Sequence, residues 1–316
     1  MDIEFYRAFE DEFRGARDLI KVRLKQYIPF INPLKEIYPH IIAIDLGCGR
    51  GEWLELMREN HISAVGVDID DKMLSACRER GLKVETADAI EYLKGLSDES
   101  VSIISAFHLV EHISFENLDR LVRESLRILK PAGLLILETP NPENIVVGAS
   151  EFYLDPTHKK PIPSKLLEFV SRYCGFNRVK VARFNEQDNI SFPELKLIDV
   201  IGGVSPDYAV ISQKVAVESL LELFNEPFDK EYGVSLIGIA ERYDAHMVDK
   251  ISVLEDKCRE AISRYTSKVN ELEGMLNEMK LAMEGKRNSL FSSYLSRCGY
   301  FLLGRLKVCM RLLKLR

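Results

Sequence analysis

Between residues 41 and 138, short apolar β-type runs alternate with helical stretches, and this alternation limits the possible folds more than any other feature. The apolar runs predict strands at 41–46, 63–68, 82–88, 100–107 and 133–138. Stretches with helical periodicity separate them, at 51–60, 71–81, 90–96 and 115–131. Strands that are apolar along almost their whole length are buried on both faces. The pattern therefore predicts a parallel sheet with helices on each side.

Two more strands are predicted after this region, at 176–184 and 207–213, with a helix between 163 and 175 before them. Together the runs predict an α/β domain with a doubly wound, seven-stranded, mostly parallel, Rossmann-like sheet. Parallel strands joined through helices cross over with right-handed topology, which leaves few arrangements of such a chain.

The first predicted strand leads into a glycine-rich turn, IIAIDLGCGRGEWL. Asp45 ends the strand, and Gly47, Gly49 and Gly51 follow before a helix begins. Glycines at such a turn allow positive φ angles and let a ligand approach the backbone closely. The spacing is G-x-G-x-G, which departs from the dinucleotide-binding G-x-G-x-x-G pattern. No lysine follows as in a phosphate-binding loop, so nucleotide phosphates fit poorly.

Acidic residues end the next two predicted strands. Asp68 in VGVDID is placed to accept hydrogen bonds from ribose hydroxyls at the carboxyl edge of the sheet. Asp88 in TADA ends the third strand, where its carboxylate could accept a hydrogen bond from the amino group of an adenine. These residues together predict a site for an adenosine-containing cofactor.

At these positions the sequence resembles the class I S-adenosylmethionine-dependent methyltransferases. The resemblance extends over about residues 40–214: 45–51 match the first motif, Asp68 the second, Asp88 with Ala89 the third, and 105–113 (SAFHLVEHI) the fourth-strand segment. It implies S-adenosylmethionine as the cofactor and methyl transfer as the activity. The alternative is a doubly wound domain without a cofactor. The implied cofactor-binding residues are Asp45, Gly47, Cys48, Gly49, Asp68, Ile69, Asp88, Ala89 and Phe107.

Three residues are candidates for catalysis. His112 follows the fourth strand and could act as a general base, or it could orient the following segment. Asp155 and His158 lie three residues apart in the long connection 139–163, which is typical of a binding loop. They could deprotonate a hydroxyl, with the carboxylate fixing the imidazole tautomer, or form a turn made rigid by Pro156. No cluster with metal-ligand spacing is recognised, so no metal is predicted.

A second, closer resemblance concerns the acceptor. The segments FYRAFEDEFRGAR, NPENIVVG and FYLDPTHKKPIP, followed by a heptad pattern, are similar to methyltransferases of bacterial O-antigen and related polysaccharide gene clusters. The similarity is to the chain-terminating type without its kinase domain. It implies methylation of a hydroxyl on the terminal sugar of a lipid-linked polysaccharide, with Phe152 and Tyr153 suited to stacking on a sugar or to anchoring the loop. A quinone precursor is the alternative acceptor. A scaffold that binds cofactor without turnover is the alternative of another class.

After residue 246 the pattern changes. Apolar or small residues recur at steps of three and four from Met247 to Met283, with one inserted residue near 266. Such heptads predict a coiled coil and a homo-oligomer, although a solvated helix packed on its own domain is the alternative. The predicted organisation is a helical segment at 1–38, the methyltransferase-like domain at 39–214, a helical connector at 215–245, the coiled coil at 246–285 and a basic amphipathic tail at 286–316.

Charge and cysteine content limit the partners. The tail holds eight basic and no acidic residues, and since the chain carries −6 in total, the rest carries −14. An acidic body does not favour nucleic acid, whereas the tail is suited to an anionic membrane surface or to a membrane-associated glycosyltransferase. The six cysteines are scattered without a CxxC pair, and no apolar run is long enough to span a membrane. We therefore expect a cytoplasmic protein, peripheral at most to the inner face of the membrane.

Overall fold

The computed structural model describes residue 13, residues 15–186 and residues 195–284. The chain divides into two units, residues 1–246 and residues 247–316. The predicted basic tail at 286–316 lies outside the described residues. Within the described ranges, no helix is long and apolar enough to cross a membrane.

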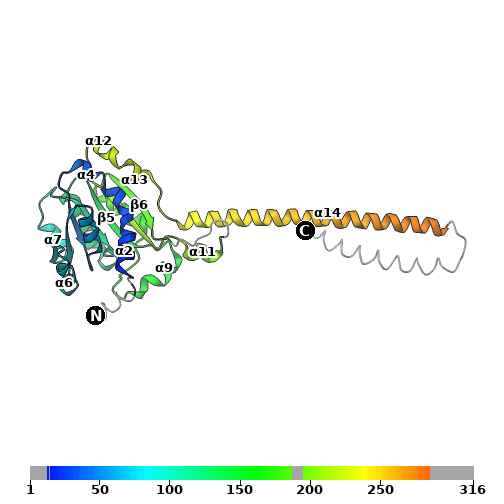
Figure 1. Cartoon of the computed structure of the whole chain (residues 1–316), viewed down its shortest axis with the longest axis horizontal. Coiled ribbons are helices and arrows are strands. Elements are labelled where there is room, and N and C mark those ends of the chain that lie inside the picture. The colour runs from blue at the N-terminus through cyan, green and yellow to red at the C-terminus, as the bar shows by residue number, and fades with distance from the viewer. Residues whose placement is uncertain (1–12, 14, 187–194, 285–316) are drawn as a thin grey trace. The chain divides into compact units, whose positions relative to one another are not determined.

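The first unit is built on the predicted seven-stranded sheet (Figure 1). Its strands lie in the order β3-β2-β1-β4-β5-β7-β6. Six of them are parallel, and β7 runs antiparallel to both β5 and β6. The strands are β1 (Ile42–Leu46), β2 (Ser63–Asp68), β3 (Val84–Thr86), β4 (Val101–Phe107), β5 (Leu129–Pro140), β6 (Arg178–Phe184) and β7 (Asp207–Gln213).

Side chains alternate between the two faces of the sheet, as the pleat requires. On β1, Ala43 belongs to the core of one face, whereas Ile44 and Leu46 belong to the core of the other. Helices cover both faces, as predicted. One face packs against α2 (Arg17–Leu24), η1 (Lys25–Tyr27), α3 (Ile28–Ile31), α4 (Leu34–Ile37), α5 (Glu52–Glu59), α12 (Glu218–Leu221), η5 (Glu222–Phe224) and α13 (Asn225–Asp229). The other packs against α7 (Ala89–Lys94), α8 (Phe115–Ile128) and α10 (Ser164–Cys174).

Two predicted boundaries change in the structure. The helix predicted at 115–131 ends at Ile128, and β5 begins at Leu129. Pro131 cannot donate a helical hydrogen bond, and Ala132 adopts a positive φ of 59°. The irregular start of β5 is accompanied by a register shift against β4 between Val101 and Ile103. The helix predicted from local propensity was therefore too long, and the predicted strand began too late.

The described part of the predicted segment 1–38 belongs to the first unit and forms part of its core. Three of its side chains are fully buried in the core on one face of the sheet: Tyr27, Phe30 and Leu34. Pro29 and Pro33 lie at the starts of short helical turns, which accounts for the division of the segment into several short elements. Residues 15–38 therefore cover one face of the sheet and contribute side chains to the cleft described below.

The long connection 139–163 contains two short helices, α9 (Ile145–Ala149) and η3 (Glu151–Leu154). Asn144 caps α9 by accepting hydrogen bonds from the amides of Val146 and Val147. Phe152 is buried, whereas Tyr153 is exposed. The amide of Lys159 donates to the carbonyl of Glu111 at 2.9 Å, so the loop is fixed beside the segment that follows β4.

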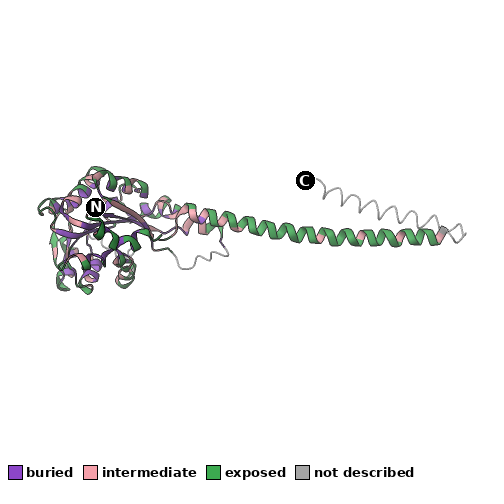
Figure 2. Cartoon of the chain, turned by 90° about the horizontal axis from the view of Figure 1, so that it is seen from above, coloured by how far each residue is buried: buried purple, intermediate pink, exposed green. Residues whose placement is uncertain are grey.

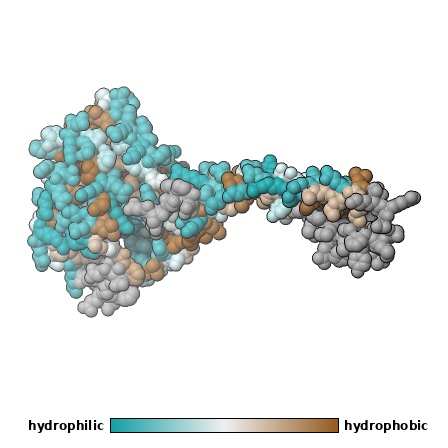
Figure 3. Space-filling model, turned by 45° about the vertical axis from the view of Figure 1, so that its right-hand side comes forward, coloured by the Kyte–Doolittle hydropathy of each residue, from teal (hydrophilic) through white to brown (hydrophobic). Residues whose placement is uncertain are grey.

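Helix α14 (Leu236–Glu284) is continuous over 49 residues. Its first turns belong to the first unit, where Ile239 packs with Leu195 and Val204. From Met247 on, nearly every residue is exposed (Figure 2). On the side of α14 visible in Figure 3, hydrophilic residues predominate and hydrophobic ones are scattered among them. The helix was predicted, but its pairing into a coiled coil stays a prediction.

Candidate functional site

A cleft of about 1220 Å³ opens where the carboxyl ends of the parallel strands meet. The strand order reverses between β1 and β4, and open α/β sheets bind ligands at such a switch point. The walls come from the ends of β1, β2, β4 and β5, the start of antiparallel β7, and η3. The volume suffices for a cofactor together with a second substrate.

The glycine loop after β1 forms one wall of this cleft. Gly47, Gly49 and Gly51 all have positive φ angles, of 69°, 47° and 79°. A Cβ atom on Gly47 would lie 3.2 Å from the side chain of Leu109, so both the backbone angle and the space favour glycine there. The amides of Gly47 and Cys48 donate to the carbonyl of Val67, which ties the loop to β2.

The two acidic residues on β1 and β2 are held by hydrogen bonds. Asp45 is buried and accepts a hydrogen bond of 2.7 Å from the Ser105 hydroxyl on β4. Asp68 accepts from the amide of Gly49 through one oxygen and from the amide of Asp70 through the other, both at 2.9 Å. The carboxylate of Asp68 therefore holds the glycine loop in shape and faces the cleft.

Asp88 lies further along the cleft. Its Oδ1 caps α7 by accepting from the amides of Ile90 and Glu91 at 2.9 and 3.1 Å, which leaves Oδ2 for a ligand. All nine residues predicted to contact the cofactor line this one cleft: Asp45, Gly47, Cys48, Gly49, Asp68, Ile69, Asp88, Ala89 and Phe107. Their contact with a cofactor stays a prediction. Cys48 is buried beside Asp45 and Asp68, and burial raises the pKa of its thiol well above the usual range, so the sulfur is not a nucleophile.

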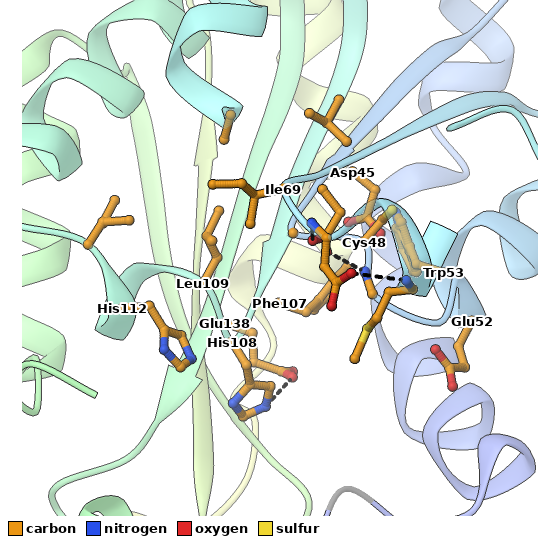
Figure 4. Close-up of a pocket in the computed structure, with 18 of the residues that line it drawn as sticks. Asp45, Cys48, Glu52, Trp53, Ile69, Phe107, His108, Leu109, His112 and Glu138 are labelled. Carbon is orange, nitrogen blue, oxygen red and sulfur yellow. Dashed lines mark hydrogen bonds and ion pairs between the residues drawn. The ribbon is translucent and has the colours of Figure 1, made fainter. Parts of the chain in front are cut away.

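A histidine and several carboxylates form the opposite part of the cleft (Figure 4). His108 has a positive φ of 55°, which turns its imidazole toward Glu138 at the end of β5. Its Nδ1 lies 3.3 Å from Oε1 of Glu111, and its Nε2 lies 3.3 Å from Oε1 of Glu138 and 3.8 Å from Asp207. Burial alone would lower the pKa of His108, but the surrounding carboxylates outweigh it and raise that pKa well above its ordinary value. The surrounding carboxylates therefore favour the protonated form of this imidazole.

Glu138 and Asp207 line the cleft without having been predicted from the sequence, and the buried Tyr27 holds Glu138 from outside the cleft. The Tyr27 hydroxyl donates to Oε2 of Glu138, and the ring packs edge-on against Trp53 and Phe107. Burial raises the pKa of Asp207 to about 6. One signal was available for Glu138, since it ends an apolar strand just as Asp45 does. Asp207 reaches the site only because β7 is antiparallel, so that its first residue lies beside the end of β5.

His112 and His158 face each other across the cleft wall, with ring centroids 4.7 Å apart. Burial lowers the pKa of His112, which favours the neutral form of its imidazole. Nδ1 of His112 lies 2.7 Å from the Thr157 hydroxyl, and that hydroxyl donates to Oδ1 of Asp155 at 2.6 Å. The chain of hydrogen bonds thus connects Asp155 to His112 through Thr157.

The predicted pairing of Asp155 with His158 needs correction. Nε2 of His158 is 3.9 Å from Asp155, too far for a hydrogen bond, and Nδ1 instead contacts the Phe152 carbonyl at 2.6 Å. Asp155 therefore does not fix the tautomer of His158; the backbone of η3 does. The reason is the turn after η3, where Asp155 is used locally by the amide and hydroxyl of Thr157. A catalytic role for His112, Asp155 or His158 stays a prediction.

No metal site was predicted from sequence spacing, but the structure brings together three side chains that could ligate a metal. Ligand atoms of Glu111, His112 and His158 all lie within 4.8 Å of one another. His158 is separated from the other two by more than 40 residues of sequence, and only the anchoring of the loop beside η2 (Val110–His112) brings it there.

Comparisons with known proteins agree with this geometry. The model of a family described as "Methyltransferase domain" matches residues 44–137. A crystal structure of an S-adenosylmethionine-dependent methyltransferase from Archaeoglobus fulgidus has 35% sequence identity and a TM-score of 0.58, covering 66% of this chain and all of that one. A probable S-adenosylmethionine-dependent methyltransferase of Mycobacterium tuberculosis is 33% identical over 134 residues, 42% of this chain and 48% of that protein.

A ubiquinone biosynthesis O-methyltransferase of Aliivibrio fischeri is 27% identical over 186 residues, 52% of this chain and 74% of that protein. The chain spans about half the length of the first curated relatives it matches.

The residues of the cleft fit S-adenosylmethionine. The cofactor carries a cationic sulfonium, and the cleft offers the buried carboxylate of Asp45 beside a loop with room for a ligand against its backbone. Asp68 and Asp88 supply carboxylate oxygens at the ends of the next two strands. With this cleft at the switch point of the sheet, and with the Archaeoglobus enzyme matched over its entire length, the chain belongs to the class I S-adenosylmethionine-dependent methyltransferases.

Proposed function

We propose that this protein methylates a hydroxyl oxygen, and that its acceptor is the terminal sugar of a lipid-linked bacterial polysaccharide. The observation that carries the proposal is the group of imidazoles and carboxylates beside the cofactor cradle. His112 and Asp155 line the same cleft as Asp45 and Gly49. A hydroxyl must lose its proton to become a good nucleophile, and a neutral imidazole at neutral pH can accept that proton.

S-adenosylmethionine supplies a methyl group on a positively charged sulfur. The acceptor oxygen forms a bond to the methyl carbon while the carbon–sulfur bond breaks and its electron pair stays on sulfur, and the hydroxyl proton passes to a base in the cleft. The chain has to align the hydroxyl with this bond, hold the proton acceptor in its neutral form and exclude water. Alignment alone supplies a large part of the rate in reactions of this type.

The wall around η3 supports a sugar acceptor. Tyr153 is 63% exposed and Leu154, which lines the cleft, is 52% exposed. Of the two, Leu154 alone lines the cleft, where its exposed side chain offers an apolar surface for one face of a sugar ring. Phe152 was predicted for the same task, but it is buried and packs on His158, so it is unsuited to stacking on an acceptor.

The second candidate acceptor is a small quinone precursor. It is favoured by the match to the Aliivibrio ubiquinone biosynthesis O-methyltransferase, which is covered over 74% of its length. The exposed stretch of α14 favours the polysaccharide, because a small diffusing acceptor requires no long helix of this kind. We further propose that α14 forms a homo-oligomeric coiled coil and that the basic residues of 286–316 attach the enzyme to a membrane surface or to a glycosyltransferase.

Radiolabelled methyl transfer tests the proposal. Purified full-length protein is incubated with methyl-labelled S-adenosylmethionine and either lipid-linked polysaccharide or a mixture of quinone precursors. We expect label in the polysaccharide fraction. Label only in the small molecules would replace the sugar acceptor with the second candidate. Tight binding of S-adenosylhomocysteine with no transfer to either would support a scaffold that binds cofactor without turnover.

A further inference from the structure

We infer that Glu111, His112 and His158 form a binding site for one divalent transition-metal ion at the acceptor end of the cleft. The three side chains come from two segments, η2 and the loop after η3, and their ligand atoms lie within 4.8 Å of one another. Two imidazoles and one carboxylate are a donor set typical of zinc and iron(II) sites that keep open positions.

The hydrogen bonds of both histidines use Nδ1, so Nε2 is the ring nitrogen that a metal would bind. Nδ1 of His158 lies 2.6 Å from the Phe152 carbonyl, which can only accept, so Nδ1 donates there and Nε2 is the nitrogen that lies toward Oε1 of Glu111. The Thr157 hydroxyl gives its hydrogen to Asp155 and must accept from Nδ1 of His112, so Nε2 is the nitrogen of His112 left for a metal. An imidazole that ligates a metal characteristically donates its other N–H in this way to a carbonyl or to a group oriented by a carboxylate.

The carboxylate of Glu111 likewise has one oxygen engaged and one left for a ligand. Glu111 is buried, and its Oε2 accepts from the Thr139 hydroxyl at 2.9 Å. Its Oε1 is buried and receives no hydrogen bond from the described residues, although it lies 4.0 Å from Nε2 of His158. The buried Oε1 of Glu111 and the two imidazoles thus place three metal-ligating groups within 4.8 Å of one another, and a cation between them would compensate the buried carboxylate.

His108 approaches the same oxygen of Glu111 from another side, at 3.3 Å. It does not depend on that contact, because Glu138 and Asp207 hold the same imidazole. Zinc ligands at about 2.0–2.2 Å from a metal lie about 3.4 Å apart in tetrahedral geometry. The side chains would therefore close by no more than about 1.4 Å to bind an ion.

The site would bind the acceptor of the proposed reaction, and this role rests on the proposed function. His112 and His158 both line the cleft, so an open coordination position would face the second substrate. A metal lowers the pKa of a bound hydroxyl and releases its proton to water at neutral pH. The imidazoles would then act as ligands, and the metal would replace the imidazole base considered above.

Metal binding is measured directly, without reference to turnover. Full-length protein is stripped with a chelator and titrated with Zn²⁺ in a calorimeter, with Co²⁺ as a spectroscopic probe. The Cys258→Ser variant is used throughout, because an exposed thiol such as that of Cys258 is a competing zinc ligand. We expect one equivalent of Zn²⁺, and an X-ray absorption spectrum with two imidazole ligands and no sulfur. Absence of stoichiometric binding, or sulfur ligation, would overturn the assignment.

Variants locate the ion. His158→Ala and Glu111→Gln should each weaken Zn²⁺ binding at least about 100-fold, whereas His40→Ala, at an exposed histidine, should leave it unchanged. Thr157→Val keeps all three ligands but removes the partner of His112, and should weaken binding about 10-fold to 100-fold. Equal affinity in all variants would place the ion elsewhere. Binding of S-adenosylhomocysteine, measured on the stripped protein, reports on folding and on the cofactor site separately, so failure of the metal site and failure of the proposed function are distinguishable.

Discussion

Asp68 combines a structural task, which its hydrogen bonds show, with a ligand-binding task that the family resemblance predicts. Both of its oxygens accept backbone hydrogen bonds, from Gly49 and from Asp70. The same carboxylate faces the cleft where the family resemblance implies a ribose. A carboxylate that already holds the glycine loop in position binds a ligand without further ordering cost.

Asp68→Asn should weaken binding of S-adenosylhomocysteine about 10-fold to 100-fold, because the loop amide of Gly49 and the ligand both lose a charged acceptor. Calorimetric titration of the full-length protein measures this. Asp98→Asn is the matched control, since Asp98 is an exposed aspartate paired with Arg127 at the surface. Equal affinity in both variants would remove Asp68 from the cofactor site.

At the scale of elements, ion pairs connect segments that the sheet brings together. Glu143, in the loop after β5, accepts two hydrogen bonds from Arg183 at the end of β6 and one from Ser164 at the start of α10. Burial would raise the pKa of Glu143, but the contacts with Arg183 outweigh burial and hold that pKa below its ordinary value. This cluster joins the long loop that carries Asp155 and His158 to the edge of the sheet.

The pH dependence of stability follows from this shift. A carboxyl group with a lowered folded-state pKa stabilises the fold fully above the unfolded value of about 4.5, and the contribution is lost as pH falls through the folded pKa. Glu143→Gln should lower the free energy of unfolding by about 1–2 kcal/mol at pH 7, and the gap to wild type should close below about pH 4.

Urea unfolding of wild type and of Glu143→Gln, at pH 7 and below about pH 4, measures this difference in the free energy of unfolding. Glu168→Gln is the control, because Glu168 pairs with Arg172 within one helix and such pairs contribute only about 0.5 kcal/mol. A gap for Glu143→Gln that is independent of pH would show that packing, and not charge, accounts for the loss.

For the whole molecule, the question is what the exposed apolar residues of α14 contact. Ile251, Leu254 and Leu272 belong to the heptad positions and are 50%, 60% and 50% exposed. Apolar side chains repeated at this period on a helix are typical of a surface that pairs with another helix. The described residues alone leave this surface without a partner, and a second copy of the chain is the occupant proposed above.

Leu254→Lys combined with Leu272→Lys should convert the oligomer to a monomer, because two charges would be buried in the seam. Light scattering on the full-length protein measures the mass. Val253→Lys combined with Met275→Lys is the matched control: both are 52–54% exposed but lie outside the heptad positions. The same mass for both double variants would mean that the heptads do not form the assembly.

Much of the fold was predictable from the sequence. The order and type of the seven strands, the glycine loop and the acidic strand ends depend on local periodicity and on backbone geometry that few residues satisfy. The nine predicted cofactor-site residues share one cleft because parallel strands end at one edge of the sheet. The ends of elements were less predictable, as the early start of β5 shows, since pairing with β4 overrides local helix propensity there.

The acceptor side of the cleft was decided only by the tertiary structure. Tyr27, Glu138 and Asp207 come from three distant segments, and an antiparallel strand brings the last of them to the site. Asp155 and His158 are close in sequence, yet the local turn separates their hydrogen bonds, while Glu111 and His112 meet His158 from across the fold. The sequence by itself determined the sheet and the predicted cofactor cradle, because these follow from the local periodicity of each strand and helix and from the common edge at which parallel strands end. The tertiary structure decided which side chains face the second substrate, because that depends on where loops from separate strands are anchored.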